Sequence, residues 1–363
     1  MKFIDEFRDA ELVRRLADKI AMISTRPARL MEFCGGHTVA IMRNGVRQLL
    51  PPHIEMLSGP GCPVCVTSNH DIDESIALAS LPDVIITTFG DMLKVPGSYS
   101  SLQQARAAGG DIRIVYSTQD ALQAARENPH RRVIFLGVGF ETTAPTVASA
   151  VLQAEKERID NFSVLCQLKL TPPAMRALLD LGETRINGII CPGHVSAIIG
   201  TRPYEAYARD YGVACVVAGF EPVDILQAVE MLVQQVEDGV ARVEIAYTRG
   251  VKPEGNMKAL ELMNSVFDTA GASWRGIGDI PQSGLKLKNK YACYDASLQF
   301  KVKLPQTREH AGCRCGEVLR GVIKPFDCLL FGKVCTPETP VGPCMVSSEG
   351  SCAAYHQYGA ADG

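Results

Sequence analysis

The chain has 363 residues, 46% of them hydrophobic and 21% charged, which excludes wholesale disorder and predicts two or three folded domains. Its formal net charge of −3 argues against a nucleic-acid-binding protein, which is normally basic. No apolar run reaches the roughly 18 residues of a transmembrane helix, and the charged N-terminus lacks a signal-peptide core. We therefore expect a cytoplasmic protein that contacts no membrane, in which clustered cysteines indicate metal or redox chemistry.

The chain begins with an amphipathic helix over about residues 8–24, where apolar side chains recur every fourth residue. Short buried strands follow near residues 83–88, 132–137, 188–190 and 214–218, each ending in a glycine turn. Strands that alternate with helical stretches predict an α/β fold with parallel sheets, whose functional residues gather at the carboxyl ends of the strands. The repeat of Gly-Phe-Glu at 139 and 219 indicates two similar α/β units.

These patterns predict three domains. Residues 25–125 form a first α/β domain, and residues 126–250 form a second. After about residue 252 the alternation fades and Pro, Gly and Cys become dense, so we expect residues 251–363 to form a smaller metal-stapled domain together with residues 1–24.

Six of the 13 cysteines lie in the C-terminal tail (Cys313, Cys315, Cys328, Cys335, Cys344 and Cys352). Irregular chain rich in Pro and Gly buries little core, so a metal or crosslinks must hold it together. The tail lacks the paired CxxC knuckles of structural zinc sites, and its long, uneven spacings favour a [4Fe-4S] cluster over zinc, disulfides or reduced structural cysteines. The spacing does not decide which four of the six thiols bind.

A second group of thiols lies near the N-terminus. Cys34 and His37 flank two glycines, and Cys62 and Cys65 form a CxxC motif, the spacing of a reversible disulfide. Three thiols and one imidazole could form a structural zinc site. They also suit a site that holds a soft, low-valent metal.

Three further polar residues are candidates for function. Asp91, with Lys94 nearby, and His194 each follow a predicted strand. Asp91 is either a proton donor or a structural turn acid, and His194 is either a functional residue at that edge or a satisfied turn histidine. Glu349 lies in the cysteine tail and is a candidate proton carrier for the cluster or the dithiols. Glu141 opens a helix, where capping is at least as well supported as catalysis. The four remaining cysteines are predicted to be core thiols (Cys166, Cys191, Cys215 and Cys293).

Five features recur in order along nearly the whole chain: Cys34-Gly-Gly-His-Thr, Gly-Pro-Gly-Cys62-Pro-Val-Cys65, Gly139-Phe-Glu-Thr-Thr-Ala-Pro, Pro192-Gly-His194-Val-Ser and the cysteine-rich tail. Together they resemble the HypD family of [NiFe]-hydrogenase maturation factors. This resemblance implies two α/β domains and a third domain that carries a [4Fe-4S] cluster.

The resemblance also implies roles for individual thiols. The cluster spacing of the family falls on Cys313, Cys328, Cys335 and Cys352. Cys315 and Cys344 then look like a second redox-active pair beside the cluster, and Cys62 and Cys65 look like an exchangeable dithiol. Cys34 matches the cysteine that binds the iron being assembled, and His37 either hydrogen-bonds a bound cyanide or caps the turn.

The resemblance implies a redox-active scaffold for the Fe(CN)2CO unit of [NiFe]-hydrogenase, rather than a conventional turnover enzyme. Its expected partners are a small HypC-type chaperone that shares the iron, a HypE-type carrier that delivers cyanide as a thiocyanate and, indirectly, the hydrogenase large subunit. Two other functions remain open. One is a thiol–disulfide oxidoreductase, fed by an Fe–S cluster, that acts on a protein disulfide. The other is a zinc-stabilised binding module.

Overall fold

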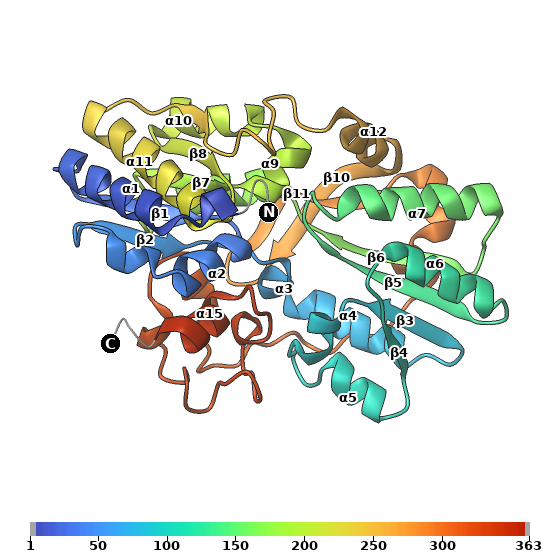
Figure 1. Cartoon of the computed structure of the whole chain (residues 1–363). Coiled ribbons are helices and arrows are strands. Elements are labelled where there is room, and N and C mark those ends of the chain that lie inside the picture. Colours follow the sequence, from blue (N-terminus) through green and yellow to red (C-terminus); the bar gives the residue numbers. More distant parts are fainter. Residues whose placement is uncertain (1–4, 360–363) are drawn as a thin grey trace.

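The computed structural model describes residues 5–359 and contains two parallel sheets and one antiparallel pair of strands (Figure 1). The first sheet contains, in spatial order, β2 (Ile54–Ser58), β1 (Ala28–Glu32), β7 (Gly188–Pro192), β8 (Ala214–Ala218) and β9 (Val243–Ile245). The second contains β4 (Asp111–Ile114), β3 (Val84–Thr88), β5 (Arg132–Gly139) and β6 (Phe162–Leu168). All strand pairs within these two sheets are parallel, so the predicted α/β class is confirmed.

Helices cover both faces of each sheet (Figure 1). The α-helices are α1 (Ala10–Ile23), α2 (Gly35–Arg43), α3 (Pro63–Val66), α4 (Asn69–Ala79), α5 (Leu102–Ala107), α6 (Thr118–Glu127), α7 (Ala144–Glu157), α8 (Thr171–Leu181), α9 (Gly193–Ile199), α10 (Glu205–Tyr211), α11 (Pro222–Asp238), α12 (Met257–Val266), α13 (Ala296–Gln299), α14 (Cys315–Leu319) and α15 (Ser351–Tyr358). Short 3₁₀ helices are η1 (Asp5–Phe7), η2 (Val46–Leu49), η3 (Gly90–Lys94), η4 (Arg202–Tyr204), η5 (Asn289–Tyr294), η6 (Pro325–Asp327) and η7 (Pro343–Met345).

Two apolar clusters fix the helices on the first sheet. Side chains from α1, α2 and α11 pack against one face, and side chains from α8 and α10 pack against the other. The second sheet is covered by α6 and α7 on one face and by α4 and α5 on the other. The cluster that includes α4 continues into the cysteine tail, so the tail shares a core with the second sheet.

The predicted N-terminal helix is present as α1. Asp9 caps it by accepting hydrogen bonds from the backbone N–H groups of Glu11 and Leu12. Its position differs from the expected pairing with the tail, because its buried face (Leu16 and Ile20) packs against α11 on the first sheet. Figure 1 shows α1 and α11 lying side by side.

The sheets also group the strands differently from the predicted ranges 25–125 and 126–250. The first sheet combines β1 and β2 with β7, β8 and β9, and the second combines β3 and β4 with β5 and β6. Each sheet therefore takes strands from both predicted ranges. The hydrogen bonding between strands therefore defines the two units by sheet. The chain leaves the first sheet after β2 and returns to it after β6.

The region after residue 252 is more regular than its composition indicated. It contains α12 and an antiparallel ribbon of β10 (Phe267–Trp274) and β11 (Gly278–Leu287). The irregular cysteine tail begins only after α13. Among the described residues, 5–359, no helix is both long enough and apolar enough to cross a membrane.

Glu141 follows β5 and caps α8 rather than the helix that it precedes. Its carboxylate accepts hydrogen bonds from the backbone N–H of Thr171 at 2.8 Å and from the Thr171 hydroxyl at 2.9 Å. The side chain is buried, and this burial raises the pKa of Glu141 from 4.5 to about 7. The folded state therefore binds the Glu141 proton more tightly than the unfolded state does.

We expect Glu141→Gln to remove part of the pH dependence of stability. The stabilisation from the protonated carboxyl is complete below pH 4.5 and is lost as the pH rises through about 7. Between pH 5 and pH 8 the wild type should lose about 2–3 kcal/mol more than the variant, measured by urea unfolding under anaerobic conditions. Glu155→Gln, on the exposed side of α7, is the control, and equal losses in all three proteins would contradict the assignment.

Candidate functional site

Cys34 lies two residues after the end of β1 and is the N-cap residue of α2. Its backbone N–H donates a hydrogen bond of 2.9 Å to the Glu32 carboxylate, which also accepts a hydrogen bond from the Thr38 hydroxyl. Glu32 is only 1% exposed, and burial raises its pKa to about 8. This buried carboxyl fixes the turn that presents Cys34, and the sequence analysis did not single it out.

Two histidines stack on one phenylalanine beside Cys34. The ring centroids of His37 and Phe220 lie 4.7 Å apart, and those of His194 and Phe220 lie 3.9 Å apart. His194 is the second residue of α9, which follows β7. His37 Nε2 donates to the carbonyl of Gly219 at 2.9 Å, while its Nδ1 atom is buried without a partner. Burial lowers the pKa of His37 to about 4 and also lowers the pKa of His194, so both rings are neutral at pH 7.

The CxxC motif follows β2 and approaches Cys34 through Gly61. The backbone N–H of Gly35 donates to the Gly61 carbonyl at 3.0 Å. A Cβ atom on Gly61 would lie 2.2 Å from the Cys34 nitrogen, so only glycine permits this approach. Cys62 and Cys65 form a disulfide across α3, with both residues buried.

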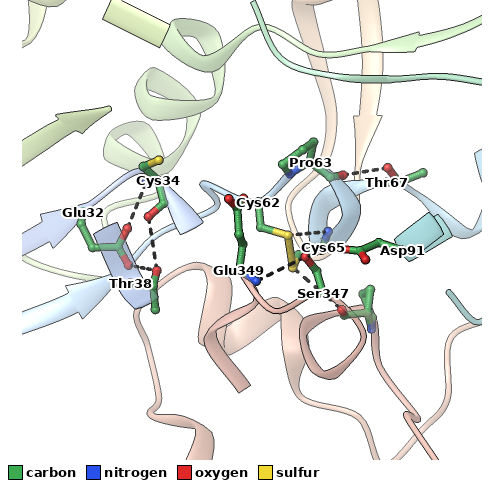
Figure 2. The surroundings of a disulfide bond; sticks show 11 residues. Glu32, Cys34, Thr38, Cys62, Pro63, Cys65, Thr67, Asp91, Ser347 and Glu349 are labelled. Atoms are coloured by element: carbon green, nitrogen blue, oxygen red, sulfur yellow. Dashed lines mark hydrogen bonds between the residues drawn. A yellow bond between two sulfur atoms is a disulfide. The ribbon is translucent and has the colours of Figure 1, made fainter. Parts of the chain in front are cut away.

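The tail reaches this site through Glu349. A Cβ atom on Gly35 would lie 2.5 Å from the Glu349 side chain, so the two segments are in direct contact. Figure 2 shows Glu349 between Cys34 and the Cys62–Cys65 disulfide. Ser347 donates from its hydroxyl to Asp91 at 2.8 Å and accepts a bond from the Glu349 N–H at 3.3 Å. The predicted residues Cys34, Cys62, Cys65, Asp91 and Glu349 thus lie around one site.

The electrostatics of this site disfavour negative charge. Burial and the nearby Glu349 carboxylate raise the pKa of the Cys34 thiol to about 12. Burial and Asp91 in turn raise the pKa of Glu349. A bound cation would reverse this preference, because a coordinated thiol is deprotonated by the metal charge. The arrangement can therefore hold a thiolate only together with a positive partner.

Five tail thiols line one small, largely apolar pocket: Cys313, Cys315, Cys328, Cys335 and Cys352. Four of them are the cluster ligands that the family resemblance implies. Within residues 5–359, no three cysteine, histidine or acidic side chains are arranged to hold a single metal ion. Thiols arranged around one small pocket are compatible with an iron–sulfur cluster, whose ligands are spread over several iron atoms.

Cys344 lies beside this pocket and is fully buried. Hydrogen bonds with the thiols of Cys315 and Cys352, together with burial, raise its pKa. The neighbouring Pro343 carbonyl lies 3.9 Å from Cys65 Sγ. Thiol contacts therefore lead from the cluster pocket through Cys315 to Cys344, and the backbone carbonyl of the adjacent Pro343 contacts the CxxC motif.

The other cysteines follow the prediction only in part. Cys191 and Cys215 are buried core thiols, as predicted. Cys293 is exposed and Cys166 is only partly buried, so the prediction was wrong for Cys293 and incomplete for Cys166. Cys293 lies in η5 on the surface, where its small side chain fills no core position.

Comparisons with known proteins agree over nearly the whole chain. The family model HypD, described as "Hydrogenase formation hypA family", matches residues 11–359. The chain is 49% identical to the hydrogenase maturation factor HypD2 of Bradyrhizobium diazoefficiens over 99% of this chain and 97% of that protein. It is 48% identical to HypD of Cupriavidus necator, over 99% and 97%, and 47% identical to HypD of Escherichia coli, over 99% and 98%.

We expect Gly61→Ala to destabilise the site. The added Cβ would clash with the Cys34 backbone, and overpacking of this kind costs about 1–3 kcal/mol. In Gly271→Ala, the control, the nearest atom to the new Cβ is 3.8 Å away, and the change should stay within about 0.5 kcal/mol. Urea unfolding midpoints of the two variants measure the difference, and an equal effect of both would contradict the close approach.

Proposed function

This chain belongs to the HypD family of hydrogenase maturation factors, and on that premise we propose that it is a redox-active scaffold for assembly of the Fe(CN)2CO unit of [NiFe]-hydrogenase. The observation that carries the proposal is the convergence of Cys34, the CxxC motif and the cysteine tail on one site. These three sets of thiols lie up to about 300 residues apart in the sequence, so their convergence in the fold supports redox or metal chemistry.

Cys34 is the proposed ligand of the iron, which is the substrate of the assembly. The raised pKa of Cys34 keeps the thiol protonated, so iron binding would displace the proton and leave a thiolate on the metal. The neutral His37 ring is buried and stacks on Phe220, and the exposed His194 ring stacks on the same phenylalanine. The unpartnered Nδ1 of His37 supports a role in orienting a bound group rather than a simple turn cap.

A [4Fe-4S] cluster would be held by Cys313, Cys328, Cys335 and Cys352. When bound, the cluster supplies electrons one at a time. The tail has little secondary structure of its own, so these ligands would also stabilise its fold.

The dithiols can deliver two electrons together, which a one-electron donor such as the cluster cannot do. Release of cyanide from a thiocyanate consumes two electrons and one proton: R–S–CN + 2e⁻ + H⁺ gives R–SH + CN⁻. Oxidation of the Cys62/Cys65 dithiol to its disulfide releases two electrons and two protons. The contacts between Cys315 and Cys344, and between Pro343 and Cys65, support a path by which the buried CxxC disulfide is reduced again. Asp91 and Glu349 lie beside this path and are the proposed proton carriers.

The proposed partners follow from the same chemistry. A small HypC-type chaperone would share the iron at Cys34, a HypE-type carrier would deliver the thiocyanate, and the completed unit would pass to the hydrogenase large subunit. We place this reaction in the cytoplasm, where the many free thiols of the chain stay reduced. His194 stacks on Phe220 at 3.9 Å, and we propose that it takes part in binding the delivered cyanide.

A thiol–disulfide oxidoreductase is the second candidate, and the Cys62–Cys65 disulfide at the start of α3 favours it. However, Cys62 is only 3% exposed and Cys65 is fully buried. A disulfide in a partner protein would have difficulty reaching these sulfurs, whereas a flexible thiocyanate-bearing segment or a bound cyanide is small. The burial therefore favours the scaffold.

We expect Cys34→Ala to abolish the infrared bands of bound cyanide and CO in protein co-purified with its partners. The reason is that the iron would lose its ligand from this chain. Cys293→Ala, which removes an exposed thiol, should retain the bands. Bands of normal intensity in Cys34→Ala would refute the assignment and leave the oxidoreductase as the better candidate.

The double variant Cys315→Ser/Cys344→Ser tests the electron path. It should keep the brown colour and the absorption of an Fe–S cluster, because the four proposed ligands remain. It should accumulate the Cys62–Cys65 disulfide and yield little Fe(CN)2CO, measured by thiol labelling and infrared spectroscopy. Cys191→Ser/Cys215→Ser is the matched double control. Normal assembly in the Cys315/Cys344 variant would exclude the relay.

A further inference from the structure

A pocket of about 480 Å³ opens beside Cys315. Neither Cys34 nor the Cys62–Cys65 disulfide lines it. This volume lies within the usual range for small-molecule sites. The wall includes the thiols of Cys313 and Cys315 together with Arg275 and Arg308. Gly342 also lines the pocket, and a Cβ atom there would lie 2.5 Å from both sulfurs. The absence of a side chain at Gly342 thus leaves room at the thiols.

Arg275 is the pocket residue that most strongly indicates an anionic ligand. It follows β10, is only 6% exposed, and donates from Nη2 to the Pro96 carbonyl at 3.0 Å. Its Nε atom is buried without a hydrogen-bond partner, and it forms no ion pair with any carboxylate of residues 5–359. A buried guanidinium without an ion-pair partner is costly, and an anion in the pocket would relieve that cost.

Other groups around the pocket point to the same kind of ligand. Arg308 also lines the pocket, where its Nε donates to the Ser98 carbonyl at 3.0 Å and its guanidinium stacks 4.2 Å from the centre of the Tyr99 ring. His310 lies beside it, and Glu309 is the one acidic residue in the wall. The two arginines outweigh that single carboxylate. Asn69, at the pocket wall, has a buried Oδ1 atom without a partner that can accept a hydrogen bond from a ligand.

We propose that this pocket binds a small thiol that carries a carboxylate, and that this thiol reduces the Cys315–Cys344 pair. The inference rests on the proposed function, because it supplies electrons to the same thiols. The carboxylate would bind Arg275 and Arg308, and the sulfur would face Cys315. The first thiolate attacks the Cys315–Cys344 disulfide, which forms a mixed disulfide at Cys315 and frees the Cys344 thiolate. A second thiolate releases the small disulfide and frees Cys315, so two small thiols are oxidised and one protein disulfide is reduced.

The test measures the reverse exchange at Cys315 in full-length, cluster-containing Cys344→Ser protein, where a mixed disulfide cannot be resolved. The probes are dithiodiglycolate, which carries two carboxylates, and neutral hydroxyethyl disulfide. Trypsin cleaves after Arg314 and so separates Cys313 from Cys315 for mass spectrometry. The exposed Cys293 in the same molecule provides the reference rate. Relative to Cys293, we expect Cys315 to prefer the anionic probe by about tenfold.

Variants then assign the preference to the pocket. Arg308→Gln should reduce it severalfold, while Arg15→Gln, on the exposed face of α1, should leave it unchanged. Glycolate, which has the carboxylate but no sulfur, should slow labelling by the anionic probe only. Equal rates for both probes, or equal effects of the two arginine variants, would overturn the proposal. Protection by glycolate without preferential exchange would show an anion site and overturn the thiol step.

These outcomes are separable from the assembly function. Loss of the charge preference with intact infrared bands of the iron unit would refute only this pocket. Loss of the infrared bands in wild-type protein with the charge preference intact would refute the assembly scaffold and leave a thiol-reducible protein.

Discussion

The site depends on one backbone contact, that between Gly61 and Cys34. The carbonyl of Gly61 accepts the N–H of Gly35, and its α-carbon lies too close to Cys34 for any side chain. This contact holds the turn after β2 against the turn after β1, although parallel strands alone would leave these turns free to diverge. The tail then packs on the other side of Gly35 through Glu349. Three segments thus meet because glycines occupy the points of closest approach.

Burial favours the neutral forms of the Cys34 thiol and the His37 ring. The pKa of Cys34 is raised to about 12 because neither water nor a cation stabilises its thiolate. His37 stays neutral for the same reason. A protonated, partly buried thiol of this kind is a weaker nucleophile than an exposed cysteine whose pKa is lowered.

The sequence indicated that Asp91 and His194 follow strands, and the structure places them after β3 and β7, while the roles of the thiols stay a prediction. It missed β1 and β2, which are short and interrupted by charged residues such as Arg29 and Glu55 that pair across the sheet edge. It missed Glu32, Phe220 and Arg275 because their importance comes from burial and distant neighbours. The α1 helix was placed wrongly beside the tail because amphipathic periodicity gives a buried face but not its partner.

The route of the chain explains why the site needs the whole sequence. The chain leaves the first sheet after β2 through the CxxC motif and α3, builds the second sheet, and returns through α8 to β7. Cys62 and Cys65 therefore lie on the crossing itself, and Thr67 bridges directly to Trp274 at the end of β10. Arg275 follows that bridge and reaches the tail thiols. A shift of one sheet relative to the other would move the CxxC motif, Arg275 and the tail together, so the spacing between the thiol pairs is set by the packing of the two sheets rather than by any one loop.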